Sequence, residues 1–140
     1  MTPAQARARF ASARVARLAT VSASGQPHLV PVTFALSGDT VYSAVDAKPK
    51  RSTALRRLAN VAANPLVSLL VDEYDEDWSK LWWVRADGTA RTLPADAPEA
   101  ARAAALLGER YAAFALRGPV LAVDVTRWVG WSAAGQSTAG

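Results

Sequence analysis

The residues best suited to chemistry gather in one short segment of the chain. Residues 46–57 hold five cations, and they lie between an apolar run typical of a strand and a run typical of a helix; they are Lys48, Lys50, Arg51, Arg56 and Arg57. The N–H groups of a first helical turn favour an anion, and cationic side chains add to this preference. The segment therefore predicts an anion site with phosphate as its ligand. A solvated helix start remains the alternative reading of these residues.

Composition excludes several kinds of catalytic centre. The 140 residues include no cysteine, so disulfides, thiol nucleophiles, thiolate metal sites and iron–sulfur clusters are ruled out. The single histidine, His28, cannot form a multi-histidine metal site, and its place at the start of a strand favours a surface role over acid catalysis. No phosphate-binding glycine loop, nucleophile elbow or zinc-protease motif is present. An enzyme of this composition would rely on a bound organic cofactor, with neither a catalytic side chain nor a metal.

The charge pattern favours a small anionic ligand over a nucleic acid. The net charge is +4, but the cations are divided among the N-terminal segment, residues 48–57 and scattered arginines, while residues 72–77 are acidic. A membrane-spanning apolar run and a secretory signal are both missing from the sequence. We therefore expect a cytoplasmic protein that binds neither nucleic acid nor membrane.

The pattern of apolar residues and turn residues predicts a mainly β domain with a few helices. Pro31 lies within one of the strand-like runs and cannot donate to a ladder, which indicates an edge strand or a bulge there. Asp87-Gly88 is typical of a turn, Asp96 and Glu99 have capping-box spacing, and residues 133–140 read as a frayed tail. We expect helices at 3–14, from Ser52 or Thr53 to 63 and at 96–115, and strands at 15–22, 28–36, 40–45, 67–71, 81–86, 89–93, 120–125 and 128–132.

Antiparallel strands with two or three flanking helices favour a small barrel, because closing a sheet removes its edges. Neither an internal repeat nor a linker is visible, so residues 1–140 are expected to form one cofactor-binding domain.

Beyond these patterns, the sequence resembles a known superfamily over nearly its whole length, from about residue 14 to residue 133. It is similar to the pyridoxamine-phosphate-oxidase-like split β-barrel proteins, and within them to the coenzyme F420-dependent oxidoreductases of the flavin/deazaflavin oxidoreductase B group. The stretch at 78–90 is the most specific part. The phrases that carry the resemblance are residues 17–22, 25–34, 46–50, 55–65 and 77–90.

This resemblance implies a homodimer of split barrels with two cofactor sites at the subunit interface. The tricyclic ring would lie against Val30, Pro31, Val32, Thr33 and Phe34, with Ser43 of the next strand as a hydrogen-bond donor. The phosphate would be bound by Lys48, Lys50, Arg51, Ser52 and Arg56, while Arg57 is the expected bystander because its helical position points it to solvent. Among five tryptophans, Trp78 and Trp82 are the favoured cofactor contacts; large aromatics nevertheless more often fill cores and interfaces.

Three functions remain open from the sequence. The leading hypothesis is an oxidoreductase that transfers hydride between coenzyme F420 and a small organic substrate. An FMN-dependent oxidase or reductase on the same barrel is the second. A non-catalytic protein that stores or sequesters F420, FMN or a haem-like molecule is the third.

Overall fold

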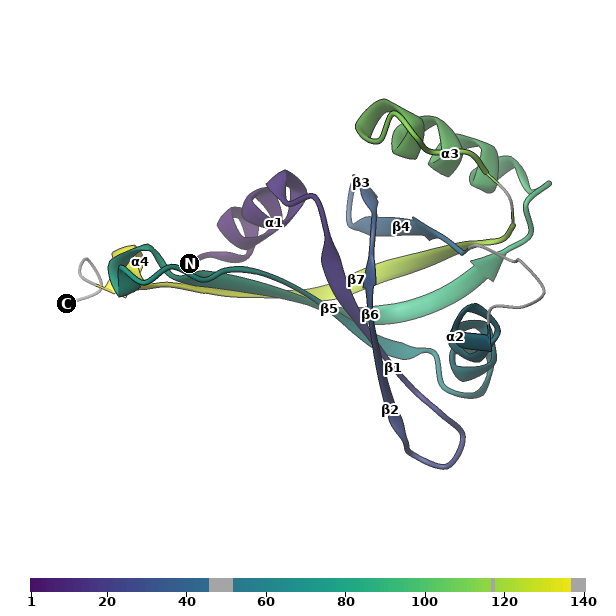
Figure 1. Cartoon of the computed structure of the whole chain (residues 1–140), viewed down its shortest axis with the longest axis horizontal. Coiled ribbons are helices and arrows are strands. Elements are labelled where there is room, and N and C mark those ends of the chain that lie inside the picture. Colours follow the sequence, from purple (N-terminus) through teal and green to yellow (C-terminus); the bar gives the residue numbers. More distant parts are fainter. Residues whose placement is uncertain (46–51, 117, 137–140) are drawn as a thin grey trace.

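A seven-stranded antiparallel sheet forms the centre of the computed structural model, which describes residues 1–45, 52–116 and 118–136 (Figure 1). Its spatial order is β2-β1-β5-β6-β7-β4-β3. The predicted fold class, an antiparallel split barrel with flanking helices, is confirmed. The strands are β1 (Ala16–Val21), β2 (Pro27–Val32), β3 (Ala35–Ser37), β4 (Thr40–Ala44), β5 (Leu66–Glu73), β6 (Trp82–Leu93) and β7 (Val120–Ser132).

The two edges of this sheet are joined directly by the chain. The expected strand at 28–36 is divided in two, because β2 ends at Val32 and β3 begins at Ala35, and these strands are the opposite edges of the sheet. Thr33 and Phe34 form the crossing. Pro31 lies in β2, an edge strand of the sheet. The sequence predicted an edge strand or a bulge at this position, because proline cannot donate a main-chain hydrogen bond to a neighbouring strand.

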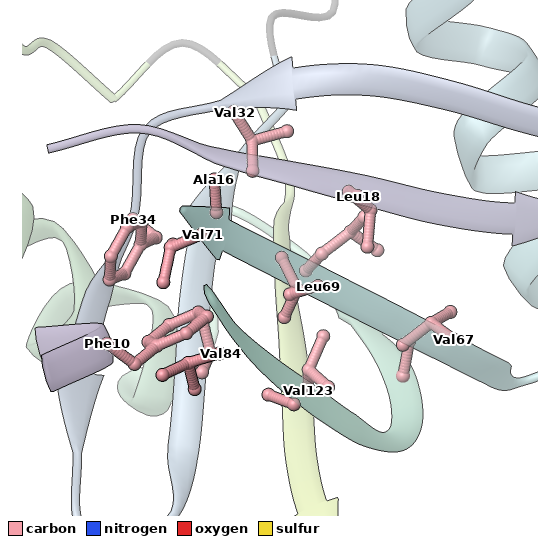
Figure 2. Close-up of a cluster of buried hydrophobic side chains, with 14 of the residues drawn as sticks. Phe10, Ala16, Leu18, Val32, Phe34, Val67, Leu69, Val71, Val84 and Val123 are labelled. Carbon is pink, nitrogen blue, oxygen red and sulfur yellow. The ribbon is translucent and has the colours of Figure 1, made fainter. Parts of the chain in front are cut away.

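The core fills the inside of the curled sheet and is almost wholly apolar (Figure 2). Helix α1 (Pro3–Ser12) begins with the Thr2 and Gln5 capping box and inserts Phe10 between strands. The Phe10 ring lies 4.8 Å from that of Phe34 and 5.2 Å from that of Trp128, measured between centroids. These contacts attach α1 to the crossing between the two edge strands and to β7.

Helix α2 (Ser52–Ala63) packs against β1 and β6. Its Val61 is buried in the core, and its Asn60 side chain, 4% exposed, donates a hydrogen bond of 3.0 Å to the buried Thr20 hydroxyl of β1. A buried amide needs such a partner, so this bond fixes the helix on the barrel.

The Asp87-Gly88 pair does not form the expected turn. β6 runs unbroken from Trp82 to Leu93, and its pairing with the equally continuous β7 shifts register between Asp87 and Gly88. A Cβ atom at Gly88 would lie 2.3 Å from the Asp124 carbonyl oxygen. The glycine therefore permits a close approach of two strands at a bulge. In the sequence, a glycine needed for such a bulge looks the same as one needed for a turn.

Helix α3 (Pro98–Arg110) differs from expectation at both ends. Ala97 is its N-cap and makes no side-chain cap bond, because Pro98 starts the helix and the Glu99 carboxylate binds Arg91 instead. The helix ends five residues before the expected Ala115, at a cap residue, Tyr111, whose backbone is extended.

Residues beyond β7 also differ from the expected frayed tail. Ala133–Gln136 forms a short helix, α4, which contacts the 3₁₀ turn η1 (Trp78–Lys80). Figure 1 shows β5, β6 and β7 continuing beyond the other strands as a long arm, with α4 at its tip. Residues 137–140 lie outside the described ranges. None of the helices that the structure describes is long and apolar enough to cross a bilayer.

Candidate functional site

One face of the sheet points away from the core, and we call it the outer face. Strand pairing aligns its side chains in rows across β2, β1, β5, β6 and β7. One row holds Leu29, Ala19, Ser68, Asp87 and Arg127, the next holds Pro31, Arg17, Leu70, Arg85 and Val129, and Asp72, Trp83 and Trp131 follow on the arm.

The outer face exposes large apolar side chains without a cover. Leu29 is 66% exposed, Leu66 is 64% exposed and Leu70 is 38% exposed. They come from β2 and β5, on either side of β1. Contiguous apolar surface of this kind marks a place where a ligand or another protein binds.

A hollow of about 290 Å³ opens on this face at the bulge. Its apolar walls include Ala19, Val21 and Leu66, and its polar side is formed by Ser68 and Asp87. Asp87 Oδ1 accepts hydrogen bonds from Ser68 Oγ at 2.7 Å and from Arg85 Nε at 2.8 Å. Burial pushes the pKa of Asp87 upward, but these bonds outweigh it and hold the pKa below its ordinary value. The hollow therefore carries a fixed carboxylate.

The arm divides its tryptophans between two faces. Trp82 packs against the core, donates from Nε1 to Glu73 at 2.8 Å and lies under the Arg9 guanidinium. Trp83 is on the outer face, paired across the strands with Trp131. Trp78 is 68% exposed at the tip. Of the two tryptophans favoured by sequence, Trp78 is free to contact a ligand, while Trp82 is occupied by its own chain.

The cation cluster is only partly described. Lys48, Lys50 and Arg51 lie outside the described residues, and Ser52 is described only as the first residue of α2. Arg56 is exposed.

Arg57, the expected bystander, is instead half-buried, and its buried Nε has no hydrogen-bond partner among the described residues. Burial lowers the pKa of its guanidinium. The prediction that Arg57 points to solvent is wrong, because positions 57, 60 and 61 share the inward side of the helix.

The predicted ring contacts at 30–34 alternate in their accessibility. Pro31 and Thr33 are exposed and Val30 is half-buried, whereas Val32 is 6% exposed and the Phe34 side chain is fully buried. Because Val30 packs against the core, on the opposite side of β2 from Pro31, a ligand on the outer face would meet only the side chains of Pro31 and Thr33. It would meet only the main chain of Val30, Val32 and Phe34.

The main chain of Phe34 is already engaged. The Tyr111 hydroxyl oxygen lies 3.1 Å from the Phe34 nitrogen and 3.0 Å from the Phe34 carbonyl oxygen. Tyr111 was not among the site residues predicted from the sequence, because helical periodicity does not indicate which side chain beyond a helix end will bind a distant strand.

Two further residues lie elsewhere than expected. Ser43 is 5% exposed, and its position in β4 places it on the same side as the core residue Val41. An external ligand does not reach it in this arrangement. His28 is half-buried, not a surface residue, and its Nδ1 is enclosed without a partner among the described residues.

A charged network fastens α3 to the sheet, and we call it the α3 network. Arg91 of β6 donates to both Glu99 oxygens at 2.7 and 2.8 Å and to Asp124 Oδ2 at 2.7 Å. The Tyr42 hydroxyl donates to Glu99 Oε2 at 2.7 Å. Hydrogen bonds from Arg91 and then Tyr42 lower the pKa of Glu99 to about 2. The bond from Arg91 likewise lowers the pKa of Asp124.

Metal ligation finds no support in this geometry. Across residues 1–45, 52–116 and 118–136, no three His, Cys, Asp or Glu side chains lie close enough together to hold a metal ion.

Comparison with known proteins assigns the chain to a family. A curated relative from Streptomyces rimosus, 5a,11a-dehydrotetracycline/5a,11a-dehydrooxytetracycline reductase, is 37% identical over 79 residues, which are 56% of this chain and 54% of the reductase. The chain therefore spans about half the length of the curated relative that it matches.

Solved structures agree on the fold. A conserved hypothetical protein from Mycobacterium tuberculosis superposes with a TM-score of 0.79 at 23% identity, covering 98% of this chain and 88% of that one. An FAD-binding protein from Mesorhizobium loti gives a TM-score of 0.71 at 23% identity, covering 93% and 94%. The sequence itself matches the family described as pyridoxamine 5'-phosphate oxidase across residues 2–131, and the chain belongs to this family.

Proposed function

We propose that this chain is an oxidoreductase that binds coenzyme F420 and transfers hydride between the deazaflavin and a small organic substrate. The observation that carries this proposal is the outer face, where exposed leucines and a hollow with apolar walls lie open. Such a surface suits a flat ring system better than a polar metabolite. The relative named as a reductase and the FAD-binding structure support redox chemistry.

The residues fit such a cofactor at both of its ends. The exposed side chains of Pro31 and Thr33 can contact a ring, and Val30, whose side chain packs against the core, can do so only with its main chain. The buried Nε of Arg57, which has no partner among residues 1–45, 52–116 and 118–136, suits an anion, because a guanidinium in a desolvated place gains most from a charged partner. Lys48, Lys50, Arg51, Ser52 and Arg56 complete the proposed phosphate contacts, and the exposed Trp78 is a proposed contact on the arm.

The chemistry divides between cofactor and protein. The reduced deazaflavin supplies the hydride when bound, and water supplies the proton that completes reduction of a polarised double bond. The protein binds and orients the two reactants and excludes water from between them. This division agrees with a chain that lacks cysteine and contains one histidine.

We further propose that a second copy of the chain covers part of the outer face and completes the site. The face presents Arg17 and Arg85 close to Asp72 and Asp87, so it offers both signs of charge around its leucines. A surface of mixed charge and exposed apolar groups can pair with itself about a two-fold axis.

Fluorescence titration tests the cofactor. We expect F420 to change fluorescence on binding at micromolar concentration in low salt, and FMN to compete only weakly. Lys48→Ala combined with Lys50→Ala should weaken this binding and leave the melting temperature unchanged, if these cations serve the ligand and not the fold. Preference for FMN would favour the flavin alternative. Binding without turnover across enones, quinones and tetrapyrroles would favour a storage protein, and no binding of either cofactor would overturn the proposal.

Sedimentation velocity tests the second copy. Leu29→Asp should convert a dimer to a monomer, because it places a charge on the most exposed leucine of the apolar face. Ala101→Asp, at an exposed position of α3, is the control and should leave the dimer intact. A wild-type monomer at all concentrations would contradict the dimer.

A further inference from the structure

One side chain, Tyr111, holds the point where the chain crosses between the two edges of the sheet. Its hydroxyl accepts the Phe34 N–H, and it lies 3.0 Å from the Phe34 carbonyl and 2.9 Å from the Arg14 carbonyl, either of which can take its single proton. The Phe34 N–H is thus paired with a side chain, and its carbonyl lies within hydrogen-bond distance of the same hydroxyl, in place of the neighbouring strand that a ladder would supply.

This contact lies where the chain passes from one edge of the sheet to the other. β2 and β3 are opposite edges of the sheet, and only Thr33 and Phe34 lie between them. Antiparallel pairing fixes β2 on β1 as far as Val32, paired with Ala16. The backbone of Thr33 therefore lies between a ladder on one side and the Tyr111 hydroxyl on the other.

Two arginines hold Tyr111 in position. Arg110 donates from Nη1 to the Ala11 carbonyl at 3.0 Å and from Nη2 to the Ala13 carbonyl, and its guanidinium lies 4.9 Å from the Phe34 ring centroid. The Arg14 guanidinium stacks on the Tyr111 ring at 4.9 Å. Arg14 also donates to the Arg110 carbonyl at 2.6 Å. The end of α3 is thereby locked to the end of α1 and to the crossing.

We propose that Tyr111 is a positioning residue for the ligand-binding end of β2. Its hydroxyl sets the place of Thr33, the exposed neighbour of Phe34, and through it the line of exposed groups that includes Pro31. The proposal rests on the proposed function, in which these residues contact the cofactor ring. Tyr111 does not itself contact the ligand, and it acts by removing the freedom of the backbone that does.

Tyr111→Phe tests this role, with Tyr42→Phe as the matched control. Each substitution removes one hydroxyl that ties the α3 region to the sheet, but Tyr42 binds Glu99 on the side of β4 that faces α3. We expect Tyr111→Phe to weaken F420 binding by about fivefold or more, and Tyr42→Phe to change it by less than about twofold, at similar losses of stability.

Amide hydrogen exchange supplies a readout that is independent of the cofactor. Exchange of the Phe34 amide should accelerate in Tyr111→Phe and stay as in the wild type in Tyr42→Phe, because only the first loses its acceptor. Unchanged Phe34 exchange, or equal loss of affinity in the two variants, would overturn the positioning role. If exchange accelerates as expected while the wild type binds neither F420 nor FMN, the proposed function fails and the ligand part of this inference fails with it.

Discussion

Two arginines that fasten α3 to the rest of the chain and the two arginines of α2 have opposite surroundings. On the α3 side, Arg91 and Arg110 each bind two different partners of the same chain, carboxylates in one case and main-chain carbonyls in the other. On the α2 side, Arg57 is half-buried and its Nε has no partner within the part of the chain that the structure describes, and Arg56 is exposed. The first pair is used by the fold, and the second pair remains available to a ligand.

This contrast teaches where charge contributes to folding and where it does not. A hydrogen bond that involves a charged group stabilises a protein by roughly 1.5–3 kcal/mol, whereas a half-buried cation without a partner contributes nothing or destabilises it. Substitution on the α3 side should therefore lower stability, and substitution on the α2 side should lower only affinity. The expected loss of stability is largest for Arg110, smaller for Glu99 and smallest for the arginines of α2.

Arg110→Met should cause the largest loss. It leaves the carbonyls of Ala11 and Ala13 without their donor and removes the cation beside Phe34. We expect the free energy of unfolding to fall by about 2 kcal/mol, measured by urea denaturation. Arg102→Met on the exposed side of α3 should change it by less than about 0.5 kcal/mol. Equal losses in the two variants would remove the distinction between bound and free arginines.

The α3 network should make stability sensitive to acid. The folded-state pKa of Glu99 is about 2, below its ordinary value of 4.5. A depressed folded-state pKa contributes stability that is present above the unfolded-state value and is lost as the pH falls through the folded-state value. The loss should therefore occur between pH 4.5 and about 2.

Glu99→Gln isolates this contribution. The variant should be less stable than the wild type by about 1 kcal/mol at neutral pH, a value set by the partial exposure of the pair. The difference should shrink as the pH falls through that range, as followed by urea midpoints. Glu109→Gln, at an exposed position of the same helix, should follow the wild-type curve. A pH-independent difference for Glu99→Gln would assign its effect to packing and not to charge.

Local sequence patterns predicted what depends on local physics. Apolar runs located the segments that form strands and the first helix, but they did not separate β3 from β2, and they divided the continuous β6 and β7. The turn predicted at Asp87-Gly88 was wrong, because a glycine needed for close strand approach looks like one needed for a turn. The capping box predicted from Asp96 and Glu99 was wrong, because the Glu99 carboxylate binds the distant Arg91 instead of a main-chain N–H at the helix start.

The candidate site was harder to predict, since it depends on contacts between distant parts of the chain. The exposed part of residues 30–34 and the exposure of Trp78 agree with a ligand-facing role, but Trp82 is occupied by Glu73 and Arg9. Tyr111 was not selected because its partner Phe34 is 77 residues away in the sequence. The sheet order, with β2 and β3 as opposite edges, is what shows that the Tyr111–Phe34 contact lies at the crossing between them.

The adjacent arginines of α2 give the sharpest test of the comparison, with the smallest expected effect on stability. Arg57→Gln should weaken F420 binding at least about tenfold, or about 1.4 kcal/mol, because it removes a desolvated cation from the proposed anion site. Arg56→Gln should weaken it less than about threefold, since an exposed cation is screened by water and salt.

Both variants should unfold at about the wild-type urea concentration, because the Arg57 Nε has no hydrogen-bond partner among the described residues whose loss would lower stability. If Arg57→Gln unfolded earlier while binding F420 normally, Arg57 would belong with Arg91 and Arg110 among the arginines used by the fold. If Arg56→Gln had the larger effect on affinity, the anion would be bound at the exposed side of the helix, and the half-buried guanidinium would need another explanation.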